Sequence, residues 1–211
     1  MWDLFSDRET GFFVEAGAYD GYTFSVSYLF ECAGWAGVLV EPLPDRAAEC
    51  ARRRPGSRVV VTALTRPGAA TAATFTRVAP YEMYSTLELT EGHAARLERD
   101  HQATTVSTVS TMTLDSVLDG HSGPIDFIVL DVEGHELSVL EGFDLDRWRP
   151  AALLVEDNSN GRDRAVRQHV QRHGYRHVAS LAHNDLFVHE GQLSLVRRLE
   201  GYWDDLGPLG R

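Results

Sequence analysis

The sequence predicts an α/β protein built on a doubly wound, mostly parallel sheet. Short apolar runs of strand length alternate with helix-like segments, and glycine, proline or acidic residues follow most of these runs. This alternation is typical of parallel sheets with helices on both faces. Because 43% of the 211 residues are hydrophobic, the chain can bury a substantial core. With no internal repeat or domain boundary, we expect a single domain over residues 1–211, with a core at about 11–190 and a C-terminal tail at 191–211.

The first half of the chain reads strand, helix, strand, helix, strand. A glycine-bounded turn, Gly17–Gly21, follows the first strand, and Pro55-Gly56 ends the second helix. The strands are predicted at Gly11–Glu15, Trp35–Val40 and Arg58–Leu64, and the helices at Tyr22–Cys32 and Leu43–Arg54.

The second half contains the two most apolar strands after a less regular middle. The run Ile125–Leu130 suits a central strand that is covered on both faces. We predict strands at Ala69–Val78, Thr104–Met112, Ile125–Leu130 and Ala151–Val155, helices at Thr90–His101 and Gly161–His173, and a closing antiparallel pair at Tyr175–Ser180 and Asp185–His189.

The composition excludes several functions. The formal net charge of −11 disfavours binding to nucleic acids and to anionic membranes. The basic residues are all arginine, which rules out Schiff-base chemistry and a P-loop lysine. Cys32 and Cys50 lack metal-ligand or redox spacing, so we interpret them as free thiols in a reducing compartment. No apolar run is long enough to cross a bilayer, and acidic residues interrupt Met1–Thr10 as a signal peptide, so we expect a cytoplasmic protein.

Ionisable residues cluster directly after the Ile125 strand. Asp131, Glu133, His135 and Glu136 follow it, and Gly134 lies in the turn. In open α/β sheets, ligands bind at the carboxyl ends of the strands. This stretch is therefore the first candidate for an active site.

A second candidate site follows the first strand, in the pattern Glu15-x-Gly17-x-x-x-Gly21. Glycines there allow close approach of a ligand, and Glu41, at the end of the next strand, can accept hydrogen bonds from ribose hydroxyls. The spacing differs from G-x-G-x-x-G, which disfavours NAD and an oxidoreductase. A turn that begins with a single glycine suits S-adenosylmethionine better, because this ligand has no pyrophosphate. The alternative is a tight turn without a ligand.

Four segments together resemble the FkbM family of S-adenosylmethionine-dependent methyltransferases: FVEAGAYDG, GVLVEPLP, TMTLDSVL and IDFIVLDVEGHELSVLEG. The resemblance implies a Rossmann-like class I methyltransferase fold, a seven-stranded sheet with an antiparallel last strand. It also implies methyl transfer to a hydroxyl of a sugar, polyketide or other secondary metabolite.

The resemblance also implies roles for individual residues. Glu41 would bind the ribose, and Asp131 would face the active site. Many members have Asn where this chain has Tyr19. The methionine end would lie against Glu15, Gly17 and Gly21, with Ala18, Tyr19 and Asp20 in the same turn.

A metal site is predicted where the Ile125 and Ala151 strands end. Asp131, Asp157 and Asn158 offer three oxygen ligands, which suit Mg²⁺ or Ca²⁺. The arrangement resembles that of catechol O-methyltransferase, in which the metal binds the acceptor hydroxyl and lowers its pKa. The alternative is that Asp157 and Asn158 cap the following helix.

The base that deprotonates the acceptor is predicted among the histidines. His135 lies beside the strand end and His183 in the loop of the last strand pair. Glu133 and Glu136 are expected to orient a histidine or bind substrate, and Tyr84 and Ser85 to form a lid over a small hydroxylated acceptor. We expect a second subunit, in a homo-oligomer, or the tail to cover the cleft. Two alternatives stay open: a metal-independent methyltransferase with a histidine base, and a non-catalytic subunit that binds S-adenosylmethionine.

Overall fold

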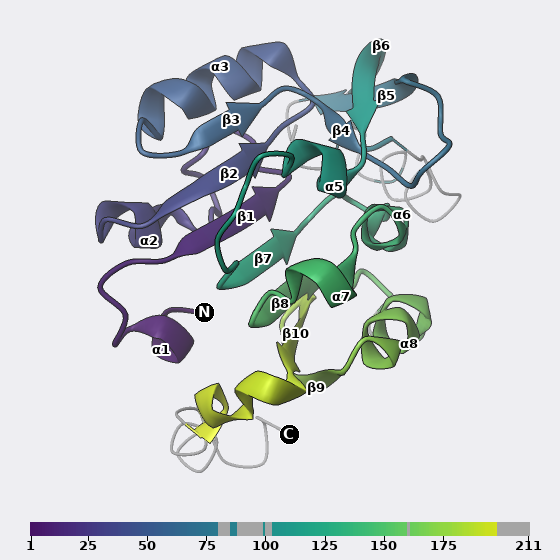
Figure 1. Ribbon diagram of the computed structural model, residues 1–211. Helices are drawn as coiled ribbons and strands as arrows, with labels where there is room; N and C mark the ends of the chain where they lie inside the picture. The colour runs from purple at the N-terminus through teal and green to yellow at the C-terminus, as the bar shows by residue number, and fades with distance from the viewer. Residues whose placement is uncertain (80–84, 88–98, 100–102, 160, 198–211) are drawn as a thin grey trace.

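The computed structural model describes the chain except for residues 80–84, 88–98, 100–102, 160 and 198–211 (Figure 1). A seven-stranded sheet forms its centre, in the order β3-β2-β1-β7-β8-β10-β9. All neighbours are parallel except β10, which is antiparallel to both β8 and β9. The strands are β1 Phe12–Ala16, β2 Ala36–Val40, β3 Arg58–Val60, β7 Phe127–Leu130, β8 Ala152–Glu156, β9 Tyr175–Leu181 and β10 Asn184–His189. The predicted mostly parallel sheet with an antiparallel last strand is confirmed.

Helices cover both faces of this sheet, because successive residues of the central strands point to opposite sides. In β1, Phe13 packs into one apolar cluster and Val14 into the other, and both are fully buried. On the Phe13 side lie α1 Trp2–Phe5, α2 Tyr28–Cys32 and α3 Pro44–Arg53; on the Val14 side lie α5 Leu114–Val117, α6 Glu136–Glu141, α7 Leu145–Trp148 and α8 Ala165–Arg172 (Figure 1). Each fully buried apolar side chain of this kind contributes about 1.5–3 kcal/mol to stability.

A smaller sheet stands beside the edge of the main one and has the order β4-β6-β5 (Figure 1). It consists of β4 Ala63–Leu64, β6 Ala103–Met112 and β5 Ala72–Ala79. The strand predicted at Arg58–Leu64 is thus split between two sheets. Thr62 lies at the break, where its hydroxyl donates to the Ser110 carbonyl at 3.1 Å.

Two predicted helices start later than the sequence indicates. The prediction of a helix at Tyr22–Cys32 is wrong over its first six residues, since α2 begins at Tyr28. The residues before it take an irregular path around the Glu15 carboxylate, and Phe24 has a φ of 59°. Likewise α8 begins at Ala165, and the helix predicted at Thr90–His101 falls almost wholly outside the described residues.

The C-terminal tail begins with the 3-10 segment η2, Glu190–Leu195. Leu195 is buried in the same apolar cluster as Leu4 and Phe5 of α1. The described part of the tail therefore packs against the α1 side of the sheet. Among the described residues, no helix combines the length and hydropathy that a membrane span requires.

Candidate active site

A cavity of about 450 Å³ opens at the carboxyl edge of the main sheet. Its lining includes residues at the ends of four strands, namely Ala16, Val40, Asp131 and Glu156. The strand order reverses between β1 and β7, beside this cavity. Ligands of open α/β sheets bind at such a reversal point. The cavity is therefore the candidate active site.

Glu15 is the residue before the last of β1 and lies beside the cavity. Residues of the loop after the strand donate hydrogen bonds to its carboxylate. The carboxylate accepts hydrogen bonds from Ser25 Oγ at 2.7 Å, Val26 N at 2.8 Å and Ser27 Oγ at 2.5 Å. The guanidinium of Arg54, which is fully buried, lies 3.9 Å from the same carboxylate. Glu15 thus fixes the shape of the loop at residues 22–27, which forms one wall of the cavity.

Gly17 allows the turn after β1 to pass close to β7. Its φ is +81°, and a Cβ at this position would lie 1.8 Å from the Asp131 carbonyl oxygen. Any other residue would therefore push the two strand ends apart. Ala18, the next residue, is buried and lines the same cavity.

Tyr19 occupies the left-handed region with a φ of 49°. Asn adopts this conformation more readily than Tyr. The backbone amide of Tyr19 donates to Glu41 Oε2 at 2.9 Å, and the Arg46 guanidinium lies 5.0 Å from the centre of its ring. Tyr19 also lines the cavity.

Asp20 and Gly21 belong to the turn and are absent from the cavity lining. The Asp20 carboxylate accepts from the amides of Tyr22 and Thr23, at 2.9 and 2.7 Å, and from Arg53. Burial opposes the charge of Asp20, but these hydrogen bonds hold its pKa below the usual value. In the structure, the two residues shape the turn instead of contacting the cavity.

Glu41 ends β2 and lines the cavity with a buried carboxylate. One oxygen accepts from the Tyr19 amide and the other from the Leu43 amide, both at 2.9 Å. Burial raises its pKa to about 7, against the effect of the two hydrogen bonds. Each oxygen keeps a lone pair for a further donor, so the side chain can accept from ribose hydroxyls.

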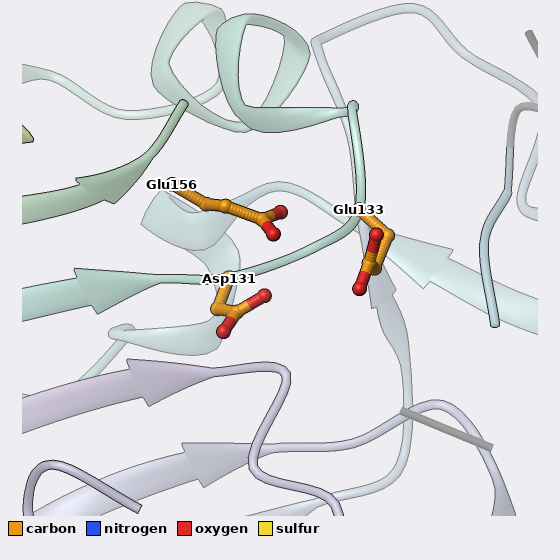
Figure 2. A group of neighbouring side chains, drawn as sticks. All are labelled: Asp131, Glu133 and Glu156. Carbon is orange, nitrogen blue, oxygen red and sulfur yellow. The ribbon is translucent and has the colours of Figure 1, made fainter. Parts of the chain in front are cut away.

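Three carboxyl groups meet on the other side of the cavity, at the ends of β7 and β8. Ligand oxygens of Asp131, Glu133 and Glu156 lie within 4.8 Å of one another. Figure 2 shows the Asp131 and Glu156 groups turned toward a common space, with Glu133 reaching in from the loop after β7. Glu133 has a φ of 54°, and its carbonyl accepts from the Thr86 hydroxyl at 2.9 Å.

The electrostatics of this carboxyl cluster favour a bound cation or proton. Burial raises the pKa of Asp131 and, together with the neighbouring carboxylates, that of Glu156. A hydrogen bond from Glu156 would lower the pKa of Asp131, and it would require a proton between the two acids. Glu156 Oε2 is buried without a hydrogen-bond partner among the described residues, and neither acid forms an ion pair with any of them. Oxygen ligands of this kind fit a hard divalent cation.

Glu136 and His135 lie at the start of α6. Glu136 Oε1 accepts from the amides of Gly134 at 3.0 Å and Val132 at 3.3 Å, so it closes the turn after β7. Burial raises its pKa despite these bonds. Glu136 is not among the lining residues, whereas His135, one residue earlier, lines the cavity.

Asp157 and Asn158, predicted as metal ligands, lie just beyond β8. The Asp157 carboxylate accepts from Ser159 N at 2.8 Å, Ser159 Oγ at 2.5 Å and Gly161 N at 2.7 Å. Asn158 is exposed. Asp157 therefore binds its own loop and does not cap the following helix, because α8 begins only at Ala165. Glu156 is the acid of this segment that lines the cavity.

The remaining predicted residues come from two loops. His183 lies between β9 and β10 and lines the cavity, and its carbonyl accepts from the Asp157 amide at 2.6 Å. Ser85 also lines it, and its hydroxyl accepts from the Val78 amide at 3.0 Å. Tyr84 lies outside the described residues.

Several lining residues were not predicted, among them Glu156, Phe24, Thr62 and Phe75. Glu156 directly follows the apolar run Ala151–Val155, and the Asp-x-Ser-x-Gly pattern from Asp157 to Gly161 is typical of an aspartate that binds its own loop. These two signals favour Glu156 over Asp157. No sequence signal places Phe24 in the cavity, because it lies in the part of the predicted helix Tyr22–Cys32 that is not helical in the structure.

Comparison with protein families gives a match over most of the chain: the profile of the Methyltransferase FkbM domain matches residues 15–177. A comparison with curated proteins gave no match. Two solved structures are similar at a TM-score of 0.44 each. One is a TehB-like SAM-dependent methyltransferase from Corynebacterium glutamicum, with 11% identity over 85% of this chain and 80% of that chain. The other is the C-terminal domain of precorrin-6Y C5,15-methyltransferase from Rhodobacter capsulatus, with 13% identity over 89% and 83%.

The family match covers both groups of cavity residues, from the β1 turn to the ends of β7 and β8. It also contains the strand reversal beside which the cavity opens. The chain therefore belongs to the FkbM family of S-adenosylmethionine-dependent methyltransferases.

Proposed function

We propose that the protein transfers the methyl group of S-adenosylmethionine to a hydroxyl of a small molecule, a sugar or a secondary metabolite, with the assistance of a divalent cation. One observation supports this most strongly: a cluster of three carboxyl groups shares a single cavity with Gly17 and Glu41. The donor side and the acceptor side of a methyltransferase would then face each other across one cavity, whose volume is about 450 Å³.

On the donor side, we assign the ribose to Glu41 and the methionine end to the turn at Gly17–Tyr19. Gly17 brings this turn against the end of β7, so that a ligand bound there lies beside Asp131. Glu15 acts through the loop that it holds. S-adenosylmethionine supplies an activated methyl group, and the protein supplies its position relative to the acceptor.

On the acceptor side, we assign a divalent cation such as Mg²⁺ to Asp131, Glu133 and Glu156. These oxygens fit such an ion, since Glu156 Oε2 has no hydrogen-bond partner among the described residues. A bound cation would hold the acceptor oxygen and lower the pKa of its hydroxyl. This set replaces Asp157 and Asn158 in our first interpretation, because the loop occupies both oxygens of Asp157.

The proton of the acceptor hydroxyl would pass to His135 or His183, which both line the cavity. Imidazole has a pKa near neutrality, as a general base requires. A metal-independent enzyme is the second candidate, because a proton shared between Asp131 and Glu156 would also satisfy the cluster.

The experiment has two parts. Calorimetric titration with S-adenosylhomocysteine should show binding that Glu41→Ala weakens at least about tenfold, as expected for two lost ribose hydrogen bonds. The matched control is Glu9→Ala, an exposed acid outside the cavity. Absence of binding by the wild-type protein would contradict the donor assignment.

The second part follows a radiolabelled methyl group into a panel of sugars and vicinal diols, with and without EDTA. We expect an O-methyl product and at least about a tenfold lower rate with EDTA, the loss expected when metal assistance is removed. A rate that EDTA leaves unchanged and that His135→Ala or His183→Ala abolishes would favour the metal-independent enzyme. A methyl group on nitrogen or carbon would contradict O-methylation.

A further inference from the structure

Phe24 is an exposed aromatic residue at the edge of the cavity. It lines the cavity, and 82% of its surface is exposed, the largest fraction among the large hydrophobic residues that the structure describes as exposed. No described aromatic ring stacks on it, and it belongs to none of the apolar clusters. Its ring therefore makes no contribution to the described core.

The backbone of Phe24 is held in an unfavourable conformation. Its φ is 59°, and it is the third residue of a turn closed by the Ser25 amide and the Tyr22 carbonyl at 3.2 Å. That position of a turn with positive φ normally carries glycine or asparagine. A bulky residue there is an outlier that the surrounding structure must impose.

Hydrogen bonds impose this conformation from both sides. Before Phe24, the Asp20 carboxylate accepts from the amide and the hydroxyl of Thr23. After it, the Glu15 carboxylate accepts from Ser25 Oγ and Val26 N. Two buried acids thus fix the loop and present the Phe24 ring at the cavity mouth.

We propose that Phe24 is a specificity-determining residue whose ring stacks against a ring of the methyl acceptor. Ala18 and Glu41, which we assign to the donor side, are buried, whereas Phe24 lines the same cavity and is open to an acceptor from solvent. The acceptor then has a flat apolar face, either an aromatic ring or the C–H face of a sugar, in addition to its hydroxyl. This inference rests on the proposed function, because it takes the cavity as the methyl-transfer site.

The test measures binding of two probes to the protein saturated with S-adenosylhomocysteine: phenyl β-D-glucopyranoside and methyl β-D-glucopyranoside. The variants are Phe24→Ala and Phe24→Tyr, and the matched control is Leu29→Ala, which removes an apolar side chain that is 62% exposed and lies outside the cavity lining. Binding is followed by ligand-observed NMR, and the affinity for S-adenosylhomocysteine is measured on the same samples.

We expect Phe24→Ala to weaken probe binding about fivefold or more, as loss of one aromatic stacking contact implies. Phe24→Tyr and Leu29→Ala should stay within about twofold of wild type, the change expected when no stacking contact is lost. A loss for the phenyl compound alone identifies an aromatic partner, and a loss for both compounds identifies the sugar face. In either case, affinity for S-adenosylhomocysteine stays unchanged.

Three results would overturn the proposal: equal probe binding by wild type and Phe24→Ala, no binding of either probe to wild type, or a loss of S-adenosylhomocysteine affinity in Phe24→Ala with probe binding intact. Failure of the proposed function looks different, because wild type would then not bind S-adenosylhomocysteine at all. A Phe24→Gly variant guards against misfolding, since glycine adopts positive φ without strain. It should unfold at the same or a higher temperature than wild type and lose probe binding as Phe24→Ala does.

Discussion

Two groups of acids at the carboxyl edge of the sheet differ in how their charges are satisfied. At the end of β1, Glu15 has three hydrogen-bond donors and a buried guanidinium nearby, and Glu31 pairs with the same Arg54 at 2.9 Å. At the ends of β7 and β8, Asp131 and Glu156 face each other with no ion pair among the described residues. The first group holds a loop in place. The second has a carboxylate oxygen, Glu156 Oε2, without a hydrogen-bond donor in the part of the chain that the structure describes, and is the group to which we assign a cation.

The difference shows that the type of residue at a strand end does not reveal its role. A buried carboxylate such as Glu15 is stable when donors surround it, whereas two carboxylates that face each other, such as Asp131 and Glu156, repel each other. The group with surplus negative charge is therefore the one available for binding or chemistry. The predictions below test this contrast.

The largest effect is expected at Arg54. Arg54→Met removes the cation between the buried Glu15 and the partly buried Glu31, so that both carboxylates keep only their neutral hydrogen-bond donors. We expect the free energy of unfolding to fall by about 3–5 kcal/mol in urea titrations. Arg53→Met is the matched control: its side chain is 39% exposed, so its loss should cost about 1 kcal/mol or less. Equal small losses in both variants would show that the first group is not held by Arg54.

A smaller effect is expected from the titration of Glu41, whose pKa burial raises to about 7. A carboxyl group whose pKa is higher in the folded state stabilises the protein below its unfolded pKa, about 4.3, and this stabilisation is lost as the pH rises through the folded pKa. Between pH 5 and pH 8, wild type should therefore lose about 2–3 kcal/mol relative to Glu41→Gln, which does not titrate.

The measurement is urea unfolding of both proteins across this range of pH. The difference in slope is the readout, because Gln also weakens one of the two backbone hydrogen bonds at any pH. Parallel profiles would mean that Glu41 is ionised throughout and that its burial is relieved in solution.

The smallest effect is expected at Asp157. Asp157→Ala removes the acceptor for Ser159 and Gly161, which should destabilise the protein by about 1 kcal/mol. Thermal unfolding measures this change, and Ser159→Ala should produce part of it. A variant as stable as wild type would indicate that these loop contacts add nothing to stability.

The sequence predicted the main sheet well because its central strands, β1, β2, β7 and β8, are buried on both faces and are rich in apolar residues. The position of Glu41, Asp131 and His135 at one cavity followed from the rule that parallel strands end at one edge. The first part of the helix predicted at Tyr22–Cys32 is a loop, because Ser25 and Ser27 donate hydrogen bonds to Glu15, which is 10 and 12 residues away in the sequence. Local propensity carries no information about such a contact.

The proposed metal ligands show a similar limit. Asp157 and Glu156 are adjacent in sequence, and the apolar pattern alone does not reveal which one faces the cavity. The outcome depends on Ser159 and Gly161, whose amides bind Asp157. Which acid faces the cavity thus depends on hydrogen bonds in the loop after β8, and the strand pattern does not determine them.

The most direct test of the contrast is a calorimetric titration of Mg²⁺ into the protein saturated with S-adenosylhomocysteine. We compare wild type with Glu156→Gln, which removes one charge from the carboxyl cluster, and with Asp157→Asn, a matched change one residue away. We predict one saturable site in wild type and in Asp157→Asn, and an affinity at least about tenfold lower in Glu156→Gln, which loses an anionic oxygen ligand. Absence of Mg²⁺ binding in wild type, or its loss in Asp157→Asn but not in Glu156→Gln, would contradict the assignment of the cluster as a cation site.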